Sequence, residues 1–132
     1  MDFRAGILSP GMHLGKYEVV CPLASGGMAE IFLARQVGIE GFEKLLVLKR
    51  ILPQHAADER FVEMFLDEAR LAATLQHVNI AQVYDMGAAD GNYYIAMEYV
   101  QGETLLSILR RDANWSRQGL PLEVALSITM GL

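Results

Sequence analysis

The segment Leu45-Leu46-Val47-Leu48-Lys49 is an apolar run that ends in a cation, and the fold is built around it. Such a run is typical of a strand covered on both faces, and Pro53 ends it because proline cannot donate to a central ladder. A lysine at the end of a buried strand either extends to solvent or meets a partner of opposite charge. Both interpretations of Lys49 stay open from this strand alone. Its neighbour Arg50 is expected on the opposite face, in solvent.

A glycine-rich turn precedes this strand. It lies between two strand-like segments, Tyr17–Cys21 and Glu30–Arg35, and should make them an antiparallel pair. Gly26 and Gly27 lack a Cβ, so the backbone N–H groups around them can approach phosphate oxygens. An ordinary hairpin also favours such glycines, so the turn alone does not identify a phosphate site.

A long helix is predicted from Glu59 to about Gln76, with Asp58 as its N-cap. Glu68 falls in the middle of its apolar stripe, whereas Asp67 falls beside it. A carboxylate on a buried face is costly unless it is paired, so Glu68 is expected to pair with Lys49. The alternative is a Glu68 at a partly wet edge. The stripe consists of Phe61, Met64, Phe65, Leu71, Ala72 and Leu75.

The remaining segments complete an α+β fold. Asp90-Gly91 is a tight-hairpin signal between two further strands, Val83–Met86 and Tyr93–Val100. Short helices are expected from Thr104 to Leu109 and from Leu122 to Met130. The predicted architecture is a five-stranded antiparallel sheet with one long helix after the third strand.

Three regions follow from this order. Residues 1–14 are expected to be a loose leader, residues 15–100 the sheet domain, and residues 101–132 a connection followed by the first helices of a second lobe, with a polar loop over 111–119.

Composition limits the class of protein. The chain has 132 residues, of which 52% are apolar and 20% charged, and these values fit one folded domain. Its net charge of -5 gives no reason to expect nucleic acid or an anionic membrane as a partner. Cys21 is a lone cysteine, and the sequence contains neither a signal-peptide pattern nor a stretch long enough to span a membrane. A cytoplasmic location is therefore expected.

In this order and spacing, the motifs closely resemble the N-terminal lobe of the eukaryotic-like serine/threonine protein kinases of bacteria. The resemblance runs from Tyr17 to the end of the chain. Besides the glycine turn, Lys49 and Glu68, it includes two later segments, His77-Val78-Asn79-Ile80 and Tyr94-Ile95-Ala96-Met97-Glu98-Tyr99-Val100.

The resemblance implies an ATP site. Lys49 would bind the α- and β-phosphates and would be held by Glu68, the two forming a supporting catalytic pair. Three apolar residues would cover the adenine: Leu23, Ile31 and Val47. The turn would cover the phosphates with Ala24, Ser25, Gly26, Gly27, Met28 and Ala29. The family usually has glycine where this chain has Ala24 and Ala29, so weaker ATP affinity is expected.

The same resemblance assigns the adenine edge. Met97 would limit the back of the pocket, and the Glu98 carbonyl and Val100 amide would hydrogen-bond the base. Glu103 or Thr104 is suggested as the residue that reaches the ribose.

The catalytic residues of the family do not occur in the 132 residues. The catalytic-loop aspartate and asparagine are missing, as is the Asp-Phe-Gly motif that holds magnesium. Mg²⁺ is therefore expected only with those missing ligands, and the chain alone is expected to be inactive. The favoured interpretation is an N-terminal fragment of a serine/threonine kinase that acts on a protein substrate. The alternatives are a non-catalytic nucleotide-binding or kinase-docking module and a remnant without function. Self-association through residues exposed near the end of the chain is also expected.

Overall fold

A computed structural model describes residues 8–112, 119 and 121–130 of this chain. The chain divides into two units. The first takes its residues from Met1–His77 and Ala81–Tyr99, and the second from Val78–Ile80 and Val100–Leu132. Among the described residues, the first unit holds the sheet and its helix, and the second holds two short helices.

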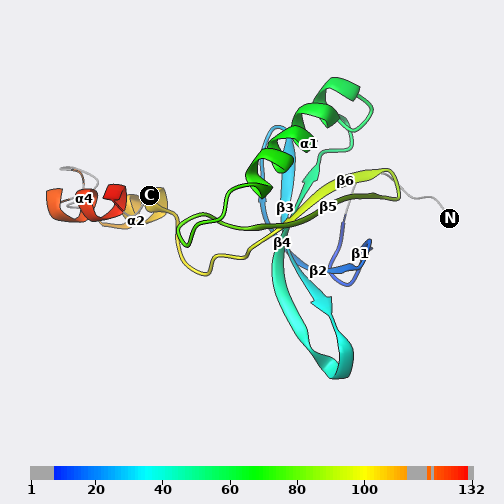
Figure 1. Cartoon of the computed structure of the whole chain (residues 1–132), viewed down its shortest axis with the longest axis horizontal. Helices are drawn as coiled ribbons and strands as arrows, with labels where there is room; N and C mark the ends of the chain where they lie inside the picture. Colours follow the sequence, from blue (N-terminus) through cyan, green and yellow to red (C-terminus); the bar gives the residue numbers. More distant parts are fainter. Residues whose placement is uncertain (1–7, 113–118, 120, 131–132) are drawn as a thin grey trace. The chain divides into compact units, whose positions relative to one another are not determined.

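The sheet is antiparallel and has six strands in the order β1-β2-β3-β4-β6-β5 (Figure 1). The α+β fold class is confirmed, but the count of five strands was one too low. The strands are β1 (His13–Leu14), β2 (Tyr17–Ser25), β3 (Ala29–Val37), β4 (Glu43–Ile51), β5 (Val83–Ala89) and β6 (Asn92–Met97).

The additional strand corrects the prediction of a loose leader. Leu14 is 1% exposed and pairs with Tyr17, and Leu8 packs against the core. Two backbone hydrogen bonds of 2.8 Å also tie this segment to β2: the Val19 N–H donates to the Met12 carbonyl, and the Gly11 N–H donates to the Val19 carbonyl. A two-residue strand is too short to show the alternation of apolar and polar residues by which strands are recognised in a sequence. Its burial comes from the strand beside it. Residues 1–7 lie outside the described residues.

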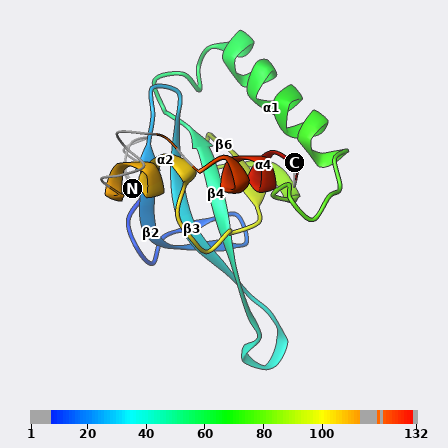
Figure 2. The ribbon, with the colours of Figure 1, turned by 90° about the vertical axis from the view of Figure 1, so that its left-hand side faces the viewer.

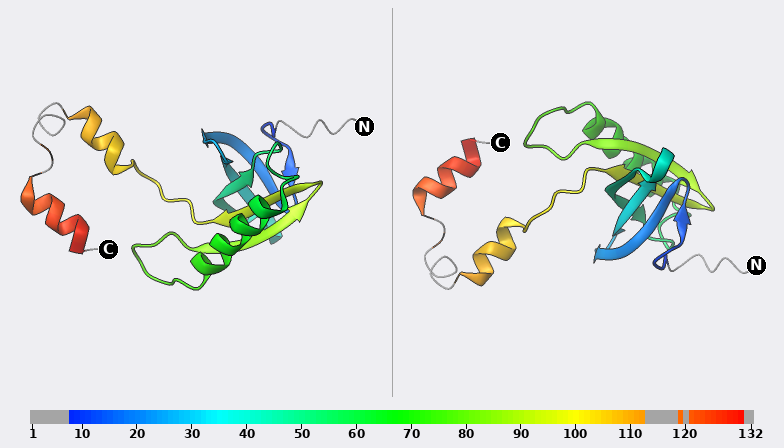
Figure 3. Two further views of the ribbon diagram at one scale, coloured as in Figure 1. Left: turned by 90° about the horizontal axis from the view of Figure 1, so that it is seen from above. Right: turned by 90° about the horizontal axis from the view of Figure 1, so that it is seen from below.

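Side chains of β4 alternate between two cores. Ile51 packs with α1 (Glu59–Ala73) on what we call the helix face, and Leu48 packs on what we call the opposite face. Figure 3 shows α1 lying across the sheet. The buried residues of the helix face are Ile51, Phe65, Ala69, Val83 and Ile95. Those of the opposite face are Leu14, Tyr17, Val19, Phe32, Ala34, Leu46, Leu48, Tyr94 and Ala96.

Helix α1 begins as predicted but uses a different face. Asp58 caps it by accepting a hydrogen bond from the Arg60 N–H at 3.0 Å. Met64 and Leu71, which belong to the predicted stripe, are 52% and 69% exposed. The buried side is centred on Phe65 and Ala69, with partly buried Val62, Leu66, Ala72 and Ala73. The predicted stripe was therefore wrong by part of a turn.

The hairpin turns differ in shape. Between β5 and β6, Asp90 and Gly91 both have positive φ, 52° and 76°, as the predicted tight hairpin requires. Strands β3 and β4 form a long hairpin that projects from the sheet, with the short 3₁₀ helix η1 (Ile39–Gly41) at its tip (Figures 1 and 2).

The second unit contains α2 (Leu105–Arg111) and α4 (Leu122–Met130). Their bounds agree closely with those of the two helices predicted from the sequence. Thr104 caps α2 by accepting a hydrogen bond from the Ser107 N–H at 3.1 Å. Residues 113–118 of the predicted polar loop lie outside the described residues. Among the residues that are described, no helix is long and apolar enough to cross a membrane.

Candidate functional site

The glycine turn is a narrow tip between β2 and β3. The Gly26 N–H donates to the Ala29 carbonyl at 2.9 Å and closes the tip. Neither Gly26 nor Gly27 has a positive φ. A Cβ at Gly27 would meet no atom within 4 Å, and one at Gly26 would meet only the Ala29 oxygen at 3.7 Å. The fold itself therefore does not require these glycines. Because they lack side chains, a ligand can approach the backbone of the turn closely.

Lys49 lies on the helix face, two residues before Ile51. In the ladder it stands between Ile31 of β3 and Ile95 of β6. Its Nζ atom is 3.9 Å from Glu68 Oε1, and its side chain is 31% exposed. The predicted pairing of these two residues is thus present.

The predicted burial of Glu68 is wrong, since its side chain is 70% exposed. Phe65 and Ala69 define the buried side of α1, and Glu68 lies beside that side. An ion pair as exposed as this contributes about 0–1 kcal/mol to stability. The role of this ion pair would therefore be to hold the Lys49 ammonium group in place rather than to stabilise the fold.

Ladder register brings together several residues that the sequence assigned to an adenine pocket. Val47 pairs with Leu33 on one side and with Met97 on the other, and Ala24 pairs with Ile31. Ile31, Val47, Lys49 and Met97 consequently share the helix face. Leu23 precedes Ala24 and is 45% exposed.

The residues assigned to the adenine edge are only partly accounted for. Glu98 is tied to Gln82 twice: its N–H donates to the Gln82 carbonyl at 2.8 Å, and its carboxylate accepts from the Gln82 N–H at 3.0 Å. Val100 belongs to the second unit and is 64% exposed. Their joint role stays a prediction. Glu103 accepts from the Ser107 hydroxyl and pairs with Arg111, so this carboxylate already has partners within the second unit.

An ion pair that was not predicted from the sequence lies on the opposite face, directly behind the site. Arg50 was expected in solvent, but it is 2% exposed, pairs with Glu30 and donates to Asn92 Oδ1 at 3.2 Å. Glu30 and Arg50 are direct ladder partners. Counting back from the β3–β4 turn would have placed them side by side.

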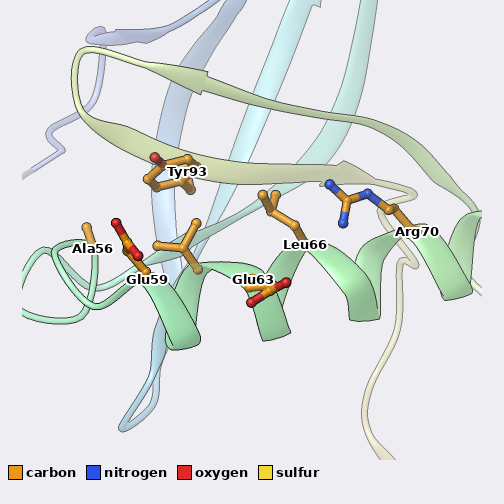
Figure 4. Close-up of a pocket in the computed structure, with 7 residues that line it drawn as sticks. Ala56, Glu59, Glu63, Leu66, Arg70 and Tyr93 are labelled. Atoms are coloured by element: carbon orange, nitrogen blue, oxygen red, sulfur yellow. The ribbon is translucent and has the colours of Figure 1, made fainter.

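Two open pockets lie away from Lys49. One of about 330 Å³ lies along the glycine turn, where Glu30 and Phe32 of its lining belong to the opposite face. The rest of its lining is Pro22, Leu23, Ala24 and Ser25, of which the last three were assigned from the sequence to the nucleotide site. The other, of about 360 Å³, lies between α1 and Tyr93 of β6 (Figure 4). Its lining residues are Ala56, Glu59, Val62, Glu63, Leu66, Arg70 and Tyr93, none of which the sequence assigned to a site.

Metal ligands are not gathered anywhere in the part of the chain that the structure describes. No cluster of three or more His, Cys, Asp or Glu residues is present there.

Together, Lys49 offers a cation, the glycine turn offers an open backbone, and the helix face offers an apolar surface. This combination suits an anionic ligand with an apolar ring.

Comparison with known proteins points to one family. The family model for protein tyrosine and serine/threonine kinases matches residues 17–132. The tyrosine-protein kinase MasK of Myxococcus xanthus is 49% identical over 125 residues, which are 95% of this chain and 19% of MasK. The serine/threonine-protein kinase PrkC of Bacillus subtilis is 37% identical over 91 residues, which are 69% of this chain and 14% of PrkC.

A solved structure has the same architecture. The crystal structure of a double mutant of the Mycobacterium tuberculosis PknI kinase domain superposes with a TM-score of 0.74 at 33% sequence identity. The match covers 92% of this chain and 46% of the PknI chain. This chain thus spans less than half of that kinase domain and a fifth or less of MasK and PrkC.

Proposed function

The chain belongs to the protein tyrosine and serine/threonine kinase family, and on that premise we propose that the helix face of its sheet binds ATP. One observation carries the proposal. Lys49 lies on the same face as Ile31, Val47 and Met97, and its ammonium group is 3.9 Å from the Glu68 carboxylate. A phosphate-binding cation thus lies next to an apolar surface on which a base can stack.

In this proposal the adenine lies against Leu23, Ile31 and Val47, and Met97 limits the depth of its pocket. The Glu98 carbonyl, in the unit that holds the sheet, binds its edge. The turn from Ala24 to Ala29 covers the phosphates, while Lys49 contacts them as a point charge held by Glu68. The two glycines that the fold does not require are those expected to approach the phosphates most closely.

The reaction that this binding serves is phosphoryl transfer from Mg-ATP to a protein hydroxyl. That step needs a catalytic base and metal ligands that the 132 residues do not contain. We therefore propose that this polypeptide binds the nucleotide but transfers no phosphate by itself. The motif resemblance favours serine or threonine as the acceptor, and MasK, named as a tyrosine kinase, supplies the alternative. We also propose a cytoplasmic location, the reducing compartment in which a lone free cysteine such as Cys21 is usual.

The missing catalytic residues also favour a second candidate, a nucleotide-binding or kinase-docking module without catalysis. Co-expression with a kinase segment that carries the catalytic loop separates the two. Restored phosphorylation supports the kinase fragment, and nucleotide binding without restored activity supports the module.

Titration with a fluorescent ATP analogue in the presence of Mg²⁺ tests the binding site. The wild-type chain should show saturable binding, and Lys49→Ala should weaken it at least about tenfold, which is 1.4 kcal/mol. Lys44→Ala is the matched control, because Lys44 lies on the same strand and contacts the Tyr84 ring instead. Equal affinity of Lys49→Ala and wild type would refute the proposed site.

A further inference from the structure

A histidine links the glycine turn to helix α1. His55 Nε2 lies 3.1 Å from the Gly27 carbonyl oxygen. The same imidazole ring stacks on Phe61 of α1, with the ring centroids 4.4 Å apart and the planes 10° from parallel. One side chain therefore contacts both the tip of the turn and the first turn of the helix. Figure 2 shows the connection from β4 to α1 running past the tip of the β2–β3 hairpin.

A second bond from the same connection holds the other tip residue. The Leu52 N–H donates to the Met28 carbonyl at 3.1 Å. The connection is itself folded, because the His55 N–H donates to the Leu52 carbonyl at 2.9 Å and the Asp58 N–H donates to the His55 carbonyl at 3.1 Å. Residues 52–55 thus hold the carbonyls of both Gly27 and Met28.

The direction of the hydrogen bond follows from the acceptor. A carbonyl oxygen only accepts, so the Nε2 atom of His55 carries the proton and donates. All described peptide bonds are trans. In a trans peptide the N–H points away from the C=O of the same unit, so holding the Gly27 carbonyl also fixes the direction of the Met28 N–H. Within the described residues, no hydrogen-bond acceptor is found for the N–H groups of Gly27 and Met28.

We propose that His55 is a positioning residue: it orients the Met28 N–H toward the phosphates and makes that orientation depend on the position of helix α1. This inference rests on the proposed nucleotide site. Fixing the turn before binding removes part of the entropy cost of ordering a glycine-rich loop around the ligand. Helix α1 also carries Glu68. The turn above the phosphates and the carboxylate that holds Lys49 are therefore both positioned by this one helix.

The test uses the 132-residue chain and two measurements. The first is the ¹⁵N-relaxation order parameter of the Gly27 and Met28 amides without nucleotide, and the second is the affinity for a fluorescent ATP analogue with Mg²⁺. His55→Ala should lower the order parameters and weaken binding about fivefold, as expected for one hydrogen bond. His55→Gln keeps a donor near the Nε2 position and should restore most of both. Phe61→Leu removes the stacked ring and should also lower the order at the turn.

Gln54→Ala is the matched control, because Gln54 is the exposed neighbour of His55. It should change neither measurement. The inference is overturned if His55→Ala leaves the turn as ordered as in wild type, or if His55→Gln is as defective as His55→Ala. If the wild-type chain binds no nucleotide, the proposed function fails, and the order parameters alone then decide whether His55 orders the turn.

Discussion

The pair formed by Glu30 and Arg50 gives a prediction in which the two ends of one interaction respond differently. Arg50 is 2% exposed, whereas its partner Glu30 is 24% exposed. Removing one partner of a fully buried pair costs about 3–5 kcal/mol, because the remaining charge stays buried. In Glu30→Ala the guanidinium group keeps its hydrogen bond to Asn92, so we expect a smaller loss of about 2–3 kcal/mol.

Arg50→Met should cost less, about 0–1 kcal/mol. The methionine fills a similar volume next to Phe32, and Glu30 can turn its carboxylate to solvent. The double variant should resemble Arg50→Met, because the pair is already lost and no buried charge remains.

Urea unfolding followed by circular dichroism measures these differences. The slope with urea should stay constant among the variants, so that midpoints report stability. A loss in Arg50→Met as large as that in Glu30→Ala would refute the reasoning, as would a double variant whose loss equals the sum of the two singles.

Three further predictions follow from the core, the pH dependence and the missing chemistry. Leu48→Ala, at a side chain with 0% exposure, should cost about 2–5 kcal/mol in urea unfolding, and a loss under 1 kcal/mol would contradict the assigned core. Burial, together with a hydrogen bond to Asp85 at 3.1 Å, raises the pKa of Tyr17, so its contribution to stability is complete below about pH 10 and is lost as the pH rises further. Tyr17→Phe should therefore flatten the fall in unfolding free energy above pH 10, and an unchanged slope would exclude Tyr17 as its source. The purified 132-residue chain should transfer no ³²P from ATP to itself or to a generic protein substrate, and labelling that is lost in Lys49→Ala would contradict this.

Sequence reasoning located the strands that carry the site because their signals are local. The apolar run before Lys49, the glycine turn and the Asp90-Gly91 hairpin each follow from nearby residues. The alternation along β4 also gave the correct face for Lys49 and Arg50. What alternation could not give was the burial of Arg50, which depends on the strand that lies beside it.

The helix shows a second limit. Its apolar residues fit two adjacent faces, one through Met64 and Leu71 and the other through Phe65 and Ala69. The sheet takes the face with the small residues Ala69, Ala72 and Ala73, which let the helix backbone approach closely. Periodicity alone does not rank two such faces, so Glu68 was expected to be buried and is exposed. The contact of His55 with the Gly27 carbonyl has no sequence signal, because it joins a turn and a connection 28 residues apart.

Intermolecular NOEs between an adenine nucleotide and the methyl groups of the sheet test the central claim most directly. With Mg-ADP bound to a chain labelled at its methyl groups and phenylalanine rings, the adenine protons should show NOEs to the methyl groups of Ile31 and Val47 on the helix face. NOEs to the Phe32 ring, which lines the pocket on the opposite face, with none to Ile31 and Val47, would contradict the account.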